Sequence, residues 1–90
     1  AKRDRDKMEN MVTKLISKVS TATQKIEQLK IYSTSVSKIL RITKNQESIK
    51  KLKTLEKQIN QSILLNEKIL VSLANQISWT IQMSLKKFLI

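Results

Sequence analysis

The spacing of apolar residues predicts long helices. From Met8 to about Thr43, apolar side chains recur in alternating steps of three and four residues, the repeat that knobs-into-holes packing between helices requires. One core position of this first heptad repeat holds Val12, Val19, Ile26 and Leu40, and the other holds Met8, Leu15, Ala22, Leu29 and Val36. β-Branched residues at the first position and Leu at the second favour a parallel coiled coil of two helices, but Ala22 and Ser33 weaken the pattern. The repeat therefore leaves the number of associating helices open.

A second and less regular repeat follows in the other half of the chain. It begins at Ile49 and Leu52 and continues through Ile59, Ile63, Leu70, Leu73 and Ile77. Glu56 and Asn66 occupy two of its core positions, so this core is partly polar. The apolar face is widened by Leu55, Ile69, Ala74 and Ile81. A face wider than two positions indicates more than one neighbouring helix, as in a three- or four-helix bundle.

The junction between the two repeats predicts a change of direction or of partner. Ile49 follows Leu40 by nine residues, so at about 100° per residue the second apolar stripe begins on the opposite face of a straight helix. A single insertion of three or four residues in a heptad pattern does not produce such a jump. Two arrangements fit: a hairpin that breaks at the junction, or a continuous rod whose helix changes partners there.

A break is expected in the most polar internal run of the chain, residues 43–48. Asn45 is suited to the left-handed conformation that ends a helix, and Asn45 or Ser48 is suited to cap the next helix. The expected organisation is a first heptad helix over 1–44, a polar junction or turn over 45–48, and a second amphipathic helix over 49–90. The junction lacks the Gly that such turns favour, which keeps the rod as the alternative.

Composition supports an all-α fold. The chain of 90 residues has no Gly, no Pro and no Cys, and aromatic residues make up only 3% of it. Gly and Pro are the usual residues of turns and hairpins, so their absence favours long helices. The predicted fold consists of long coiled-coil helices, arranged as a two-helix hairpin that packs into a larger helical bundle.

The chain is expected to be intracellular, in the cytoplasm or nucleus, because it has no cysteines for a disulfide framework. Its charged beginning resembles the surface of a helix already in progress, so we expect it to belong to a longer protein. The longest uncharged stretch, from Ile69 to Leu85, is shorter than the roughly 20 apolar residues of a membrane span and contains Asn75 and Gln82. No transmembrane span is predicted.

The residues that carry most enzyme chemistry are missing or scattered. There is no His and no Cys, and there are only seven carboxylates. Asp4 and Asp6 are two residues apart, so they would not face each other on a helix. A phosphate-binding loop would need Gly. The sequence therefore predicts no catalytic residues, no metal site and no cofactor.

The net charge of +11 is concentrated in the middle of the chain. Between Lys14 and Lys57 the basic side chains are opposed only by Glu27, Glu47 and Glu56. Such a region suits a nucleic-acid backbone or an anionic membrane surface, where counterion release provides affinity without sequence specificity. The lysines are spread around the helix, however, and no aromatic residues alternate with them for base stacking. The favoured interpretation is a solvated face, or a face that contacts acidic protein.

The pattern of charge beside the first repeat bears on the partner. In a parallel homodimer in register, Lys25 of one helix would lie near Lys30 of the other, and Lys18 would meet only Thr23. Each such repulsion costs roughly a few tenths of a kcal/mol. We therefore expect the first helix to prefer an acidic helix of another protein, or an antiparallel copy, with homo-oligomers as the alternative.

Together these patterns predict a non-catalytic coiled-coil module for oligomerisation and assembly of a larger protein or complex, acting as a structural scaffold through protein–protein interaction. The alternative is a basic helical segment that binds nucleic acid or an anionic membrane surface. Trp79 is singled out as a candidate interface anchor, because Trp often dominates binding energy when it is desolvated; ordinary packing within a helical bundle is the equal alternative. The expected partner-binding residues are Val12, Leu15, Val19, Ile26, Leu29, Val36, Leu40, Ile59, Ile63, Leu70, Leu73, Ile77 and Trp79.

Overall fold

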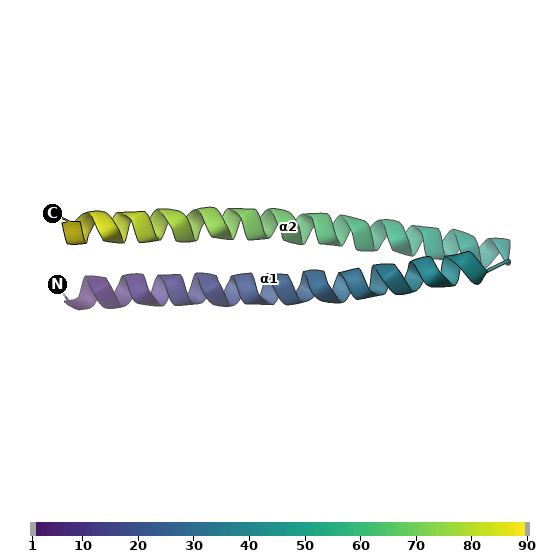
Figure 1. Ribbon diagram of the computed structural model, residues 1–90, viewed down its shortest axis with the longest axis horizontal. Coiled ribbons are helices and arrows are strands. Elements are labelled where there is room, and N and C mark those ends of the chain that lie inside the picture. Colours follow the sequence, from purple (N-terminus) through teal and green to yellow (C-terminus); the bar gives the residue numbers. More distant parts are fainter. Residues whose placement is uncertain (1, 90) are drawn as a thin grey trace.

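The computed structural model is a hairpin of two long antiparallel helices (Figure 1). α1 spans Lys2–Ile42 and α2 spans Gln46–Leu89. The structure describes the backbone of residues 2–89 and the side chains of residues 6–87; residues 1 and 90, the outer ends of the two expected helices, lie outside the described residues. The predicted all-α class and the hairpin are confirmed. A continuous rod of this chain would be about 135 Å long, whereas the longest dimension is 67 Å.

The turn occupies residues 43–45, and its hydrogen bonds explain where each helix stops. The Thr43 amide and hydroxyl both donate to the carbonyl oxygen of Ile39, which closes the last turn of α1. Asn45 Oδ1 accepts hydrogen bonds from the amides of Glu47 at 2.9 Å and Ser48 at 3.2 Å. This side chain satisfies two amides that have no partner at a helix start. Asn45 is thus the N-cap of α2, which begins at Gln46, three residues before the expected start at residue 49.

No left-handed residue is needed in this turn. Among the described residues, none has a positive φ angle, so the left-handed conformation expected for Asn45 is not adopted. The absence of Gly is therefore no obstacle, because only a positive φ angle would have favoured it. The charges at the helix ends also favour the turn. Arg41 lies in the last turn of α1 and Glu47 in the first turn of α2, where each interacts favourably with the dipole of its helix.

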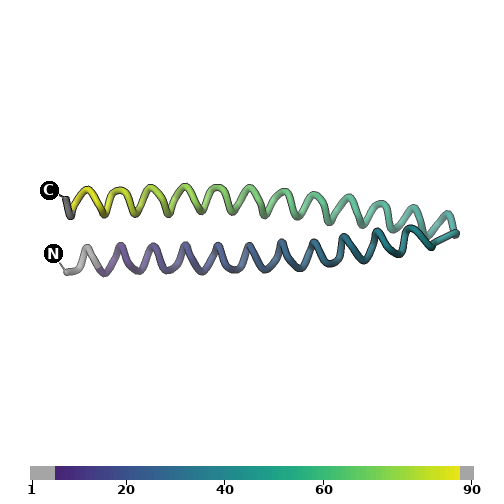
Figure 2. Tube along the Cα trace, viewed as in Figure 1, coloured from purple at the N-terminus to yellow at the C-terminus, as the bar shows by residue number. Residues whose placement is uncertain are grey.

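The two helices pack along their whole length, with the termini at one end and the turn at the other (Figure 2). The core positions of both heptad repeats face each other. Buried side chains come from both helices: Leu15, Ala22, Ile26 and Val36 from α1, and Ile59, Leu73 and Thr80 from α2. No described side chain has less than 2% of its surface exposed. Two helices alone do not enclose a side chain on all sides, so the core is thin.

Two polar residues of this core, Thr80 and Asn66, form hydrogen bonds within their own helix. Thr80, which is 4% exposed, donates its hydroxyl hydrogen to the carbonyl oxygen of Gln76 at 2.8 Å. Half-buried Asn66 donates from Nδ2 to the carbonyl oxygen of Ser62 at 2.8 Å. No buried side-chain nitrogen or oxygen among the described residues lacks a hydrogen-bond partner. Thr80 and Asn66 therefore enter the interface without leaving a buried side-chain donor or acceptor unpaired.

Candidate functional site

The expected partner-binding residues, with the exception of Trp79, lie between α1 and α2. Leu15, Ile26, Val36, Ile59 and Leu73 are buried there. The rest are half-buried: Val12, Val19, Leu29, Leu40, Ile63, Leu70 and Ile77. The partner that covers these side chains is the other helix of the same chain. Any surface for a further protein therefore has to be sought outside the heptad core.

Trp79 lies outside this core and is 62% exposed. Thr80, the next residue, takes the core position, because it follows Leu73 by seven residues and continues the repeat. A rotation of about 100° per residue then turns Trp79 to the flank of the interface. Its large apolar ring is left largely in water, which is costly unless another surface covers it.

Exposed apolar side chains gather on one side of the hairpin. With the core position of Val12 and Ile63 lettered a and that of Leu15 and Leu73 lettered d, positions g and c flank the core on this side in both helices. In an antiparallel pair the g positions of the two helices adjoin. We call this side the g side. Its exposed large apolar residues are Met11, Tyr32, Ile39, Ile42, Leu55, Leu65, Ile69, Trp79 and Met83. The sequence pattern had pointed to Leu55 and Ile69 as widening the apolar face, but not to Met11, Ile39 or Ile42.

A groove of about 850 Å³ lies on the g side near the termini and extends onto the outer face of α2, where Lys68, Val71 and Asn75 hold other heptad positions. Met11, Lys14, Leu15 and Lys18 of α1 form one wall. The other wall belongs to α2 and consists of Lys68, Val71, Ser72, Asn75, Gln76, Trp79 and Thr80. The groove therefore has an apolar interior between two helices, with lysines along its edges and amide side chains on the α2 wall.

A second groove of about 480 Å³ continues the first toward the turn. The two grooves share Lys18, Ser72 and Gln76, so they form one channel, which we call the g-side groove. The continuation adds Lys25 and Ile69 to its walls and passes over buried Ala22. Ala22 is the smallest apolar residue of the first repeat, and its short side chain leaves room where a Leu would fill the space.

The groove on the other side of the hairpin differs from the g-side groove in volume and charge. A groove of about 410 Å³ near the termini is lined there by Met8, Glu9, Val12, Thr13, Ile81, Ser84 and Leu85. It contains a carboxylate and no lysine. The g-side groove has the opposite character, because Lys14, Lys18, Lys25 and Lys68 line it and no carboxylate does. The two sides of the hairpin are thus chemically distinct.

The lysines and the apolar interior of the g-side groove suit binding of a surface that is both apolar and anionic.

Among the described residues, no group of three or more His, Cys, Asp or Glu side chains is placed to hold a metal ion. Within the same part of the chain, neither helix has a segment that is both long enough and apolar enough to cross a membrane. Comparison of the chain with models of known families, with curated proteins and with solved structures finds no match.

Proposed function

We propose that this chain is a non-catalytic coiled-coil assembly module, which joins a larger protein or complex by packing its exposed g side against helices of another protein. The expected partner helices are acidic and belong to a different chain. Self-association is the alternative form of the same function. The proposal makes the hairpin one part of a larger helical bundle.

The observation that carries this proposal is the large surface of the hairpin. Its accessible area is 7566 Å², whereas a compact monomer of 10.4 kDa is expected to expose about 5,400 Å². The excess of about 2,200 Å² is larger than the roughly 800 Å² that each partner buries in a standard protein–protein interface. One or two further helices on the hairpin would remove an area of this size from water.

The chemical nature of the exposed area supports the same function. Met11, Val71 and Trp79 are each more than half exposed and line one groove. Exposed apolar side chains that line one groove are a feature of many interaction sites. A helix packed between α1 and α2 would cover these side chains as the third member of a bundle, in the helix-in-groove mode of recognition.

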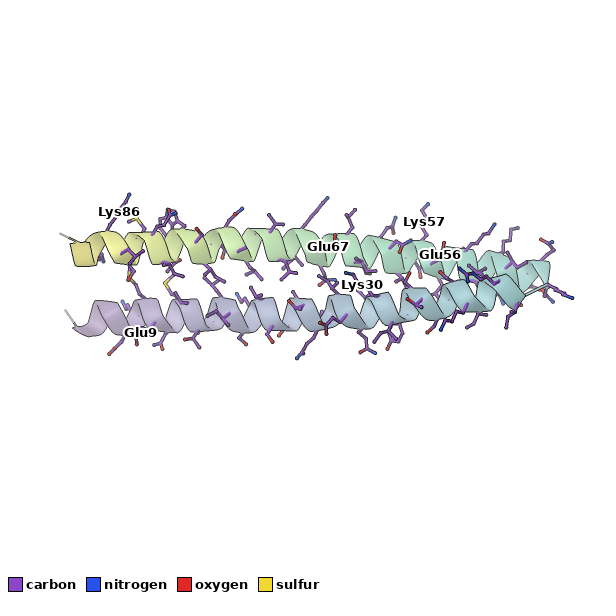
Figure 3. The ribbon with its side chains drawn as sticks, viewed as in Figure 1. Glu9, Lys30, Glu56, Lys57, Glu67 and Lys86 are labelled. Atoms are coloured by element: carbon purple, nitrogen blue, oxygen red, sulfur yellow. The ribbon has the colours of Figure 1, made fainter. Side chains whose placement is uncertain are left out.

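The alternative function is binding to nucleic acid or to an anionic membrane surface, and the net charge of +11 favours it. Affinity for phosphates would need the basic side chains to act together along one face. Lys57 instead points away from α1, on the outer side of α2 (Figure 3). Lysines on both the outer side and the g side fit a generally basic surface better than a single phosphate-binding face.

Sedimentation equilibrium tests the proposed function against its alternative. The chain is measured alone over a range of concentrations, then with a synthetic acidic heptad peptide, and then with a single-stranded oligonucleotide, at low and at high salt. We expect a defined increase in mass with the peptide that survives high salt, because apolar packing is only weakly screened. The proposal fails if the chain stays monomeric alone and with the acidic heptad peptide, and gains mass only with the oligonucleotide at low salt.

A further inference from the structure

We propose that the g-side groove is the docking site, and that its occupant is an acidic amphipathic helix of another protein that covers Trp79. This inference rests on the proposed assembly function and assigns the site and the charge of the partner. Three properties of the groove support the inference: its length, its apolar interior and the positive charge of the side chains along its edges.

The groove has the dimensions of a helix-binding channel. On α1 its walls run from Met11 to Lys25, and on α2 from Asn66 to Thr80. At about 1.5 Å of rise per residue, each wall extends about 21 Å. This length matches four turns of a docked helix, which would present about four apolar side chains to the channel.

The interior of the groove supplies contacts for an apolar stripe. Leu15 forms part of its floor at 8% exposure, and Met11, Val71 and Trp79 stand beside it with more than half of their surface free. Trp79 lies on the α2 wall with Met11 across from it on the α1 wall. A flat indole beside a flexible thioether forms a surface that adapts to Leu or Ile side chains.

The edges of the groove select the charge of the occupant. Lys14, Lys18 and Lys25 follow the α1 edge, Lys68 follows the α2 edge, and no carboxylate lines the channel. A helix with Glu or Asp beside its apolar stripe would place these carboxylates next to the lysines. A second copy of this chain is disfavoured, because it brings 18 basic residues against 7 acidic ones and would set lysine against lysine.

Trp79 provides a direct readout, since it is the only Trp in the chain. The probe is a four-heptad peptide without Trp, with Leu at its core positions and Glu at the flanking positions. Two control peptides have the same length: one with the same composition in scrambled order, and one with Lys in place of each Glu. Emission of Trp79 reports coverage of the groove, and sedimentation equilibrium of the same mixtures reports association anywhere on the chain.

The variants separate the groove from general charge. The test variant carries Lys14→Glu and Lys18→Glu, both on the groove edge. The matched control carries Lys30→Glu and Lys57→Glu, so it has the same net charge as the test variant. Lys30 and Lys57 line neither part of the groove. Circular dichroism of each variant is compared with the parent chain, so that a loss of folding is recognised. Affinity is measured by anisotropy of a dye on the peptide.

We expect the acidic heptad peptide to bind as one copy per chain and to shift Trp79 emission to the blue. Reversal of Lys14 and Lys18 should weaken binding about tenfold, and the control variant should bind nearly as well as the parent. Trp79→Ala should weaken binding about 30-fold, as loss of an interface anchor does. The scrambled peptide and the Lys peptide should bind at least about tenfold more weakly than the acidic heptad peptide.

Four results would overturn the inference. An increase in mass without any change in Trp79 emission would place the partner elsewhere, and the proposed assembly function would stand without this site. If the scrambled peptide or an oligonucleotide binds as tightly as the acidic heptad peptide, the groove attracts anions in general and is not a specific helix-binding site. A concentration-dependent shift of Trp79 without any peptide would make a second copy the occupant. If no peptide binds and the chain stays monomeric, the site and the proposed function fail together.

Discussion

Met11 of α1 and Trp79 of α2 line the same groove, although 67 residues separate them along the chain. The hairpin brings them together because its two termini lie at the same end (Figure 2). Neither residue occupies a core position of its heptad repeat, so the contact between the helices does not depend on them. This separation of roles allows binding and folding to be tested by different substitutions.

Trp79→Ala should leave the stability of the hairpin nearly unchanged, whereas Leu73→Ala should lower it. Trp79 is 62% exposed and Leu73 is 7% exposed. We expect a change within about 0.5 kcal/mol for Trp79→Ala and a loss of roughly 2 to 4 kcal/mol for Leu73→Ala, which leaves a cavity in the core. Urea denaturation followed by circular dichroism measures both. A large loss from Trp79→Ala would mean that its ring supports the hairpin itself.

Leu29→Asp should unfold or strongly destabilise the hairpin, in contrast to Lys38→Asp. Leu29 is half-buried in the interface, and Lys38 is exposed. A carboxylate at position 29 would be placed among apolar side chains without a partner, at a cost of about 3 kcal/mol. The exposed substitution should cost less than about 1 kcal/mol, mainly through helix propensity and the helix dipole. Thermal melts compare the two variants, and equal melting temperatures would show that the assigned heptad positions are wrong.

Asn45→Ala should weaken the turn. It removes the oxygen that accepts hydrogen bonds from the amides of Glu47 and Ser48. The expected loss is about 1 kcal/mol, the usual cost of removing an N-cap. Asn60→Ala is the matched control, because Asn60 is exposed inside α2 and Ala is the better helix former there. The control should be neutral or slightly stabilising, and an equal loss in both variants would argue against the capping role.

Cysteines introduced in pairs should report the antiparallel arrangement, since the chain has no Cys of its own. Val12 and Ser84 line the same groove, so a short bismaleimide should crosslink Val12→Cys with Ser84→Cys within one chain. Val12→Cys with Leu52→Cys is the control, because Leu52 lies near the turn and Val12 near the termini. A gel of the products separates monomer from dimer. Ready crosslinking of Val12→Cys alone into a dimer, unaffected by salt, would indicate a parallel homodimer and contradict the preference inferred from Lys25 and Lys30.

Two features of the structure were accessible to sequence reasoning only in part. Thr80 follows Leu73 by one heptad, so its core position was implied by the repeat, but the sequence pattern was followed only as far as Ile77. Its hydrogen bond to the Gln76 carbonyl oxygen satisfies that hydroxyl inside the helix. The break was expected within residues 43–48, with the junction itself at 45–48, and the turn lies at residues 43–45, because Asn45 caps α2 and Thr43 closes α1 through their side chains.

The sequence by itself determined the helices and the side chains that lie between them. Helical geometry repeats every 3.6 residues, and this local rule converts the spacing of Val12, Leu15 and Ile26 into one apolar face. The nine-residue step from Leu40 to Ile49 also implied that the two faces could not belong to one straight stripe. Both inferences need only neighbours along the chain.

Only the tertiary structure decided between hairpin and rod, and which apolar side chains stay uncovered. The choice depends on contacts between distant segments, such as those that bury Leu15 and Leu73, and no local pattern specifies them. Once the antiparallel pair has formed, its g positions lie side by side, and Met11, Lys18 and Trp79 become the walls of a common groove. That groove exists in neither helix alone, because each helix contributes only one wall.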